Sequence, residues 1–219
     1  MNAVDPVAAY WEIKLDKARK ALEANGFEVS IHESLEQAAK SAVQEIAPAT
    51  KARSVGFGGS KTVADSGVLD LFKEHPDFDL MDARNPMLSP AGVVELRRQM
   101  LLSDLYLSSA NALTMDGKLI NRDRTGNRTG AIHFGPLKVI LMVSRNKICE
   151  TVEDAVTRVK AIAGPMNTIR LNMATPCVKT GVCMDCKSPD RICSVWTITE
   201  KCWPAGRIHV QLINRDSGF

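Results

Sequence analysis

The run Lys138-Val139-Ile140-Leu141-Met142-Val143 holds five apolar residues in succession. A nearly continuous apolar run of this length is typical of a β-strand that is covered on both faces, as in a parallel sheet. Helical and strand-like patterns alternate along the chain that leads up to it. The sequence therefore predicts an open, Rossmann-like α/β fold with a layered sheet.

Periodicity and turn signals divide the rest of the chain into expected elements. Pro48 and Gly164-Pro165 are expected to end helices, and Asp116-Gly117 predicts a two-residue hairpin turn between apolar runs. Helices are expected over 6–25, 34–46, from 60–62 onward, 89–102 and 151–163, and strands over 27–31, 54–57, 78–81, 104–108, 138–143, 195–199 and 207–213.

The glycine-rich turn after the strand over 54–57 is the first candidate binding site. Gly56, Gly58 and Gly59 lead into Ser60 and Lys61, where a helix begins. A strand, a glycine turn and a helix N-terminus together present backbone N–H groups to an anion. The stretch is neither a Walker loop nor a G-x-G-x-x-G motif. A tight turn inside an α/β core is the alternative interpretation.

A polar, glycine-punctuated loop over 121–130 is the second candidate. It contains Arg122, Arg124 and Arg128 together with Asn127. Guanidinium groups bind carboxylates and phosphates in a bidentate manner. Asn127 and Arg128 are therefore taken as candidate ligand-binding residues, with a solvated loop as the alternative.

Residues 175–193 read TPCVKTGVCMDCKSPDRIC and form a C-terminal cysteine-rich loop with the spacing C-x5-C-x2-C-x6-C. A C-x2-C pair and two outlying cysteines can complete a four-sulfur shell around a metal. Gly181 and Pro189 interrupt regular structure, and the loop has too few apolar residues to hold its shape by burial. A metal site is therefore predicted on Cys177, Cys183, Cys186 and Cys193.

Iron–sulfur chemistry is favoured over zinc because the loop has a single short cysteine pair, whereas structural zinc sites usually use two. Lys179, Lys187 and Arg191 would offset excess thiolate charge. We expect a [4Fe–4S] cluster, with zinc as the alternative. Disulfides, redox-active thiols and plain structural cysteines remain open. The first residues lack a signal peptide, which favours the cytoplasm, where disulfides are rare.

Composition narrows the functional classes further. Of 219 residues, 45% are hydrophobic, which allows a sizeable core, and the net charge is only +3 with few aromatic residues. We therefore expect neither nucleic-acid binding nor a membrane span. Cys149 and Cys202 fall outside the metal spacing, and His133 and His209 are expected to be core or surface histidines rather than ligands.

Several segments together resemble a known family. SVGFGGSKTVADSG (54–67), LSSANALTMDGKLINRDRTGNRTG (107–130), PLKVILMVSRNKI (136–148) and AGRIHVQLINRDSGF (205–219) resemble the LUD domain of lactate-utilisation proteins such as lactate utilisation protein C. The resemblance implies one LUD domain over 1–219 with the NagB/RpiA/CoA-transferase fold. It also implies that the turn over 56–60 lies where relatives bind an acidic or phosphorylated ligand.

Three functions are compatible with this reading. The first is an iron–sulfur component of an organic-acid oxidation system resembling lactate utilisation, working with partner subunits. The second is a small-molecule transferase or isomerase with a structural cysteine loop. The third is a regulatory or assembly subunit. Catalytic residues stay unidentified, because Asp65, Asp116 and Asp123 are better explained as capping or turn residues.

Overall fold

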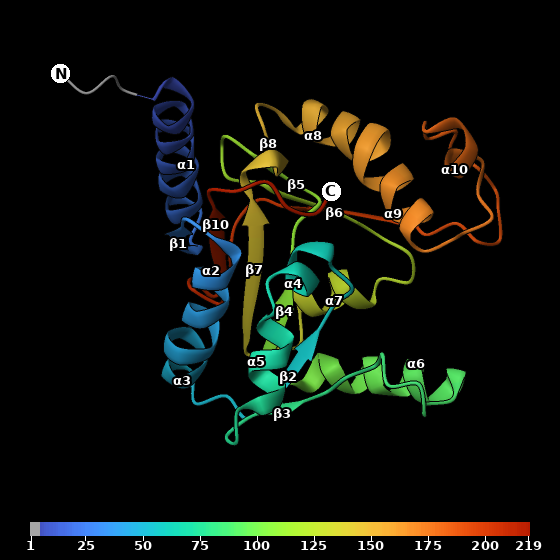
Figure 1. Cartoon of the computed structure of the whole chain (residues 1–219), viewed down its shortest axis with the longest axis horizontal. Helices are drawn as coiled ribbons and strands as arrows, with labels where there is room; N and C mark the ends of the chain where they lie inside the picture. The colour runs from blue at the N-terminus through green and yellow to red at the C-terminus, as the bar shows by residue number, and fades with distance from the viewer. Residues whose placement is uncertain (1–4) are drawn as a thin grey trace.

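The chain folds around a six-stranded parallel sheet (Figure 1). A computed structural model describes residues 5–219. Residues 1–4 of the predicted domain lie outside this described part. The strands, in spatial order, are β1 (Glu28–His32), β10 (Ile208–Ile213), β7 (Lys138–Ser144), β4 (Leu105–Ser108), β2 (Ser54–Phe57) and β3 (Asp79–Leu80). The predicted open α/β fold is confirmed.

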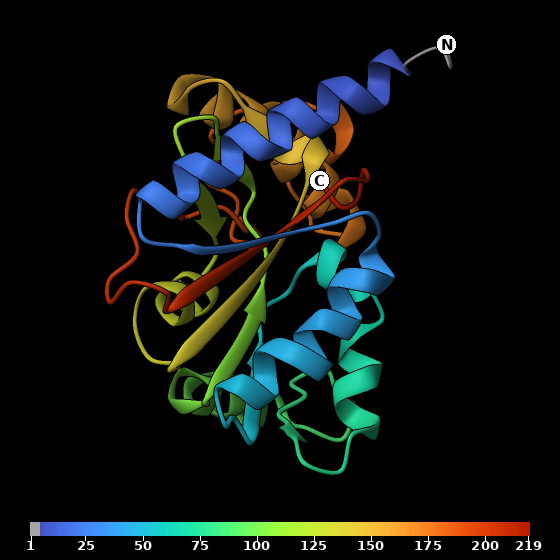
Figure 2. The ribbon, with the colours of Figure 1, turned by 90° about the vertical axis from the view of Figure 1, so that its left-hand side faces the viewer.

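The central strand β7 is buried along its whole length, as its apolar run predicted. Val139 and Leu141 pack into one apolar cluster with α1 (Pro6–Ala24), whereas Ile140 and Met142 pack into another. That second cluster includes residues of α2 (Leu35–Ser41) and α5 (Val68–Glu74). Figure 2 shows the sheet between α1 and the α2–α5 layer. Side chains that alternate along a strand thus fill two cores.

The hairpin predicted at Asp116-Gly117 is present, but it belongs to a second sheet. The second sheet has the order β8 (Ile148–Cys149), β5 (Ala112–Thr114), β6 (Leu119–Asp123) and β9 (Val195–Thr199). Helix α8 (Val152–Arg158) covers it through Ala155. The sequence did not predict this sheet, because β9 pairs with a hairpin remote in sequence and β8 has two residues.

Two prolines predicted to end helices lie inside them instead. The π-helical segment η1 (Ala42–Ile46) runs directly into α3 (Ala47–Ala49), in which Pro48 is the second residue. In the same way, the π-helical segment η4 (Val159–Ala163) runs into α9 (Gly164–Arg170), in which Pro165 is the second residue. Proline blocks an α-helix through its missing N–H and its clash with the carbonyl four residues earlier. The wider i→i+5 turn changes that local geometry, so the helix continues.

Two further boundaries differ from expectation. The helix expected from 60–62 is split into α4 (Lys61–Asp65) and α5, because Gly67 adopts a left-handed conformation (φ +72°) between them. The loop expected over 121–130 continues β6 to Asp123 and then forms α7 (Asn127–His133). The remaining elements are α6 (Pro90–Gln99), η2 (Met100–Leu102), η3 (Arg145–Lys147) and α10 (Pro176–Thr180). No helix within residues 5–219 is long and apolar enough to cross a bilayer.

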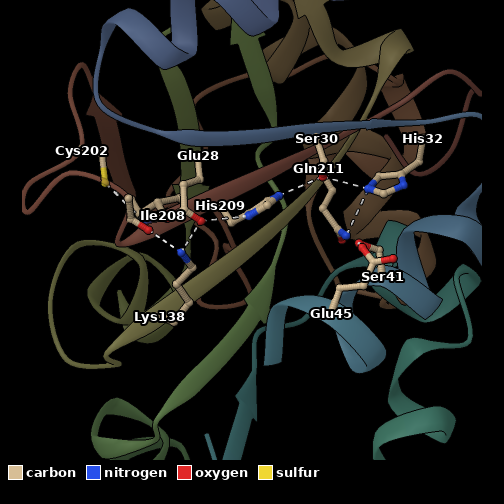
Figure 3. Close-up of polar contacts among 11 residues, drawn as sticks. Glu28, Ser30, His32, Ser41, Glu45, Lys138, Cys202, Ile208, His209 and Gln211 are labelled. Atoms are coloured by element: carbon tan, nitrogen blue, oxygen red, sulfur yellow. Dashed lines mark hydrogen bonds and ion pairs between the residues drawn. The ribbon is translucent and has the colours of Figure 1, made fainter. Parts of the chain in front are cut away.

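A polar network joins the edge strand β1 to its neighbours β10 and β7 (Figure 3). The Lys138 ammonium donates to Glu28 at 2.6 Å, and Glu28 is 3.2 Å from Nδ1 of His209. The Ser30 hydroxyl lies 2.9 Å from Nε2 of His209 and 2.8 Å from Nε2 of His32. Burial lowers the pKa of both histidines, with Glu45 opposing at His32 and Glu28 at His209. These contacts link β1, β10 and β7.

Candidate functional site

The order of the strands places a crevice between β2 and β4. From β2 the chain passes outward to β3, whereas from β4 it passes to β7 in the opposite direction. Neighbouring strands whose connections diverge leave an opening at their carboxyl ends, and open α/β proteins bind ligands there. A cleft of about 370 Å³ occupies this position and is within the size range of small-molecule sites.

Basic side chains dominate the lining of the cleft. They are Lys61, Arg84, Arg97, Arg122, Arg124, Arg128, Lys147 and Arg170, whereas Asp123 is the acidic lining residue. Within residues 5–219, only Lys61 and Arg84 of this set have a carboxylate within 4.0 Å. The cleft therefore carries excess positive charge, which a bound anion would compensate.

The predicted glycine turn divides into a packed part and an open part. A Cβ on Gly58 would lie 2.7 Å from Cγ of Arg128, and one on Gly56 would lie 3.0 Å from atoms of Tyr106 and Met100. A Cβ on Gly59 would meet nothing within 4 Å, and Gly59 lines the cleft. Gly56 and Gly58 thus serve packing, and Gly59 borders the space for a ligand.

Ser60 and Lys61 also line the cleft, but the helix behind them is short. The Ser60 hydroxyl accepts from the backbone N–H of Val63 at 3.3 Å, and Lys61 pairs with Asp65 at 2.5 Å. Since α4 has five residues, its dipole offers little to an anion. Charge on the lining side chains is therefore a better basis for anion binding than the predicted helix N-terminus.

Arg128 is buried beneath the cleft, and both of its Nη atoms are hydrogen-bonded to protein oxygens. Its Nη1 donates to Ser109 O at 3.0 Å and to Asn121 Oδ1 at 3.2 Å, and its Nη2 donates to Asn111 Oδ1 at 2.8 Å and to Arg122 O at 2.9 Å. Because these acceptors are all neutral, Arg128 contributes net charge to the cleft. Asn127, the other residue predicted in this segment, lines the cleft at the start of α7.

Lys147 is a lining residue that the sequence did not single out. It is 2% exposed and follows β7 at the carboxyl edge of the sheet. Its ammonium group lies 2.7 Å from the Thr62 hydroxyl and 2.9 Å from the Ser109 hydroxyl. Burial, followed by the charges of Arg158 and Arg128, lowers the pKa of Lys147 to about 7. The sequence signal that could have identified Lys147 as a site residue is its position just after the predicted core strand.

The cysteine-rich loop lies against the cleft and is held by arginines. Arg191 donates to Cys186 O at 2.6 Å and to Cys193 O at 3.2 Å, and Arg122 donates to Cys193 O at 3.1 Å. Arg124 donates to Pro189 O at 3.3 Å. Side-chain hydrogen bonds to the backbone therefore organise this loop, and the metal site on its four cysteines stays a prediction.

The sulfurs themselves form no complete shell. All six cysteines are free thiols, and among residues 5–219 no three cysteine, histidine or acidic side chains are arranged to hold a metal ion. Cys177 Sγ instead lies 3.2 Å from the hydroxyls of Thr168 and Thr175. Burial raises the pKa of the Cys193 thiol, against the charges of Arg122 and Arg191. In the metal-free chain, the four sulfurs are therefore not assembled around one point.

Cys149 and Cys202, the two cysteines outside the 175–193 loop, lie in other parts of the fold. Cys202 is buried in the apolar cluster that contains α1, and Ile208 N donates to its sulfur. Cys149 is half-buried at β8.

A parallel sheet with a basic cleft at its switch point defines an open α/β protein of the Rossmann-like class. The LUD domain family model matches residues 15–213, so the chain belongs to the LUD domain family. A crystal structure of a DUF162 family protein from Deinococcus radiodurans is similar, with a TM-score of 0.52 over 93% of this chain and 98% of that chain. At 15% sequence identity this likeness shows the fold alone. No curated protein matches the sequence.

Proposed function

We propose that this LUD-domain protein binds a small organic acid in the cleft between β2 and β4 and acts in organic-acid utilisation. The observation that carries the proposal is the lining of eight basic side chains against one acidic side chain. Membership of the LUD domain family supports the class of ligand, since that family is associated with lactate utilisation. A carboxylate or phosphate would compensate the excess charge.

Binding of an acid is common to the redox component and to the alternative transferase or isomerase. Both need a negatively charged substrate group held at the carboxyl edge of the sheet, and they differ only in the chemistry that follows. A regulatory subunit could also use the cleft to sense the acid. The cleft would therefore bind the same class of ligand in all three cases.

Two neighbouring arginines on α6 provide a matched test. Arg97 lines the cleft, whereas Arg98 pairs with Glu95 outside it. Calorimetric titration with lactate and with pyruvate should show saturable binding. Arg97→Gln should weaken it roughly fivefold, about 1 kcal/mol, and Arg98→Gln should leave it unchanged. Equal effects of the two substitutions would contradict binding in this cleft.

The iron–sulfur component remains a second candidate, predicted from the cysteine spacing. It is supported by proximity, because the Cys183 and Cys186 thiols lie near enough to contribute to the raised pKa of Cys193. Cys177 would have to leave its two threonine hydroxyls to complete a shell. A bound cluster would supply electron transfer to partner subunits, and no step of the proposal above depends on it.

A further inference from the structure

Lys147 differs from the other basic residues of the cleft in its surroundings. It is the most buried of them, at 2% exposed, and within residues 5–219 it has no carboxylate within 4.0 Å. Two hydroxyl groups contact it instead, and the positive charges of Arg158 and Arg128 act on it against the weaker effect of the Asp65 carboxylate. A buried ammonium without a counter-ion is unfavourable, so this environment favours the neutral amine.

The hydrogen bonds show how that amine is arranged. The Ser109 hydroxyl donates to Met142 O at 2.6 Å, and the Thr62 hydroxyl is 3.4 Å from Ser217 O. Because each hydroxyl has one proton and directs it to a carbonyl, each accepts a hydrogen bond from Nζ of Lys147. A neutral amine has two N–H groups and one lone pair. Both N–H groups are thus used, and the lone pair keeps no partner among the described residues.

We propose that Lys147 is the nucleophile of this cleft and forms an imine with a 2-oxo acid, an inference that rests on the proposed function. Neutral lysines that are desolvated or next to another cation are the ones that condense with carbonyl groups. The surrounding arginines would hold the carboxylate of the same substrate. A carbonyl next to a carboxylate therefore matches both features of the cleft.

The step balances without any further reactant. The lone pair of Nζ adds to the ketone carbon and forms a C–N bond, and one proton passes from Nζ to the former carbonyl oxygen. Loss of the oxygen with the two former N–H hydrogens as water leaves the imine. No oxidant or reductant is needed. Lactate has the carboxylate but a hydroxyl in place of the ketone, so it can bind in the cleft and cannot condense.

Reductive trapping tests the proposal on the whole chain. The protein is incubated with pyruvate near pH 7.5, treated with borohydride, and analysed by intact mass and peptide mapping. We expect one adduct, located on Lys147, that adds the mass of pyruvic acid less one oxygen, because condensation releases one water and reduction adds two hydrogens. Lactate should give none. In Lys147→Met the yield should fall at least about tenfold, whereas exposed Lys73→Met should match the wild type.

The alternatives give different results. An adduct on Lys61, adducts spread over surface lysines, or no adduct would overturn the proposal. Peptide mapping of the wild type locates the adduct even if Lys147→Met does not fold, which circular dichroism would reveal. Calorimetric binding of lactate and pyruvate without a trapped adduct would remove the imine and keep the organic-acid cleft. Absence of both binding and adduct would remove both proposals.

Discussion

The cleft and the cysteine-rich loop lie side by side, and both contain groups suited to a ligand. In the cleft, the chain itself fixes those groups: Arg128 has four protein acceptors and Lys147 has two. In the loop over 175–193 the backbone is fixed, by Arg122, Arg124 and Arg191, but the four sulfurs are not assembled. The first site is preorganised, and the second is not.

This difference separates what each site would need in order to act. A preorganised cationic cleft can bind an anion without rearrangement, so most of its binding energy is available to the ligand. A four-sulfur centre would require Cys177 to break its contacts with Thr168 and Thr175. The cleft should therefore function in the metal-free chain, and metal loading should be the step that changes the loop.

The largest expected effect comes from adding one methyl group beneath the cleft. Gly58→Ala would place a Cβ 2.7 Å from Cγ of Arg128, so either the arginine or the turn must move. We expect the free energy of unfolding in urea to fall by about 2–4 kcal/mol. In Gly59→Ala the added Cβ would lie in open space, so the free energy of unfolding should change by less than about 0.5 kcal/mol. Similar losses of stability in the two variants would show that the packing of Gly58 against Arg128 is not rigid.

The next effect is the pH dependence that Lys147 confers on stability. Its pKa is about 7 when folded and 10.5 in its ordinary state, so between these values the unfolded chain binds a proton that the folded chain does not. Stability relative to Lys147→Met should therefore rise with pH, by about 1.4 kcal/mol per unit. Urea unfolding of both proteins from pH 7 to pH 9 would measure it. A flat difference would mean that Lys147 is charged when folded.

The sequence predicted the scaffold of the cleft better than its chemistry. The buried run at Lys138–Val143 and the glycine turn placed β7 and β2 correctly, because burial and turn geometry are local signals. The sequence analysis missed Arg97, Arg170 and Lys147. These residues are far apart in the sequence, and only the order of the strands in the sheet brings them to the same cleft. The helix ends predicted at Pro48 and Pro165 were also wrong, because composition does not indicate the π-helical turn that precedes each proline.

A smaller effect should follow from releasing the cysteine loop. Arg191→Ala removes hydrogen bonds to Cys186 O, to Cys193 O and to the Asp185 carboxylate. We expect about 1–2 kcal/mol of local destabilisation, visible as faster hydrogen exchange over 175–193. Exchange of β7 amides should be unchanged. If β7 also exchanges faster, the loop is part of the core and the two regions are not separable.

The smallest expected effect on the metal-free protein is that of Cys177→Ser. A serine hydroxyl can make the same contacts with Thr168 and Thr175, so the free energy of unfolding should change by less than about 1 kcal/mol. After anaerobic reconstitution with iron and sulfide, the same variant should hold less iron than the wild type if the four-cysteine prediction is right. Cys202→Ser, with its sulfur in another part of the fold, is the control. Equal iron in all three proteins would contradict a centre on this loop.

Binding of pyruvate to chelator-treated, metal-free protein is the most direct test of the cleft. A calorimetric titration would compare the wild type with a variant in which Cys177, Cys183, Cys186 and Cys193 are all serine. We predict saturable binding in both, equal within about twofold and weakened by added salt. Binding that appears only after iron is loaded, or that disappears in the four-serine variant, would contradict a preorganised organic-acid site.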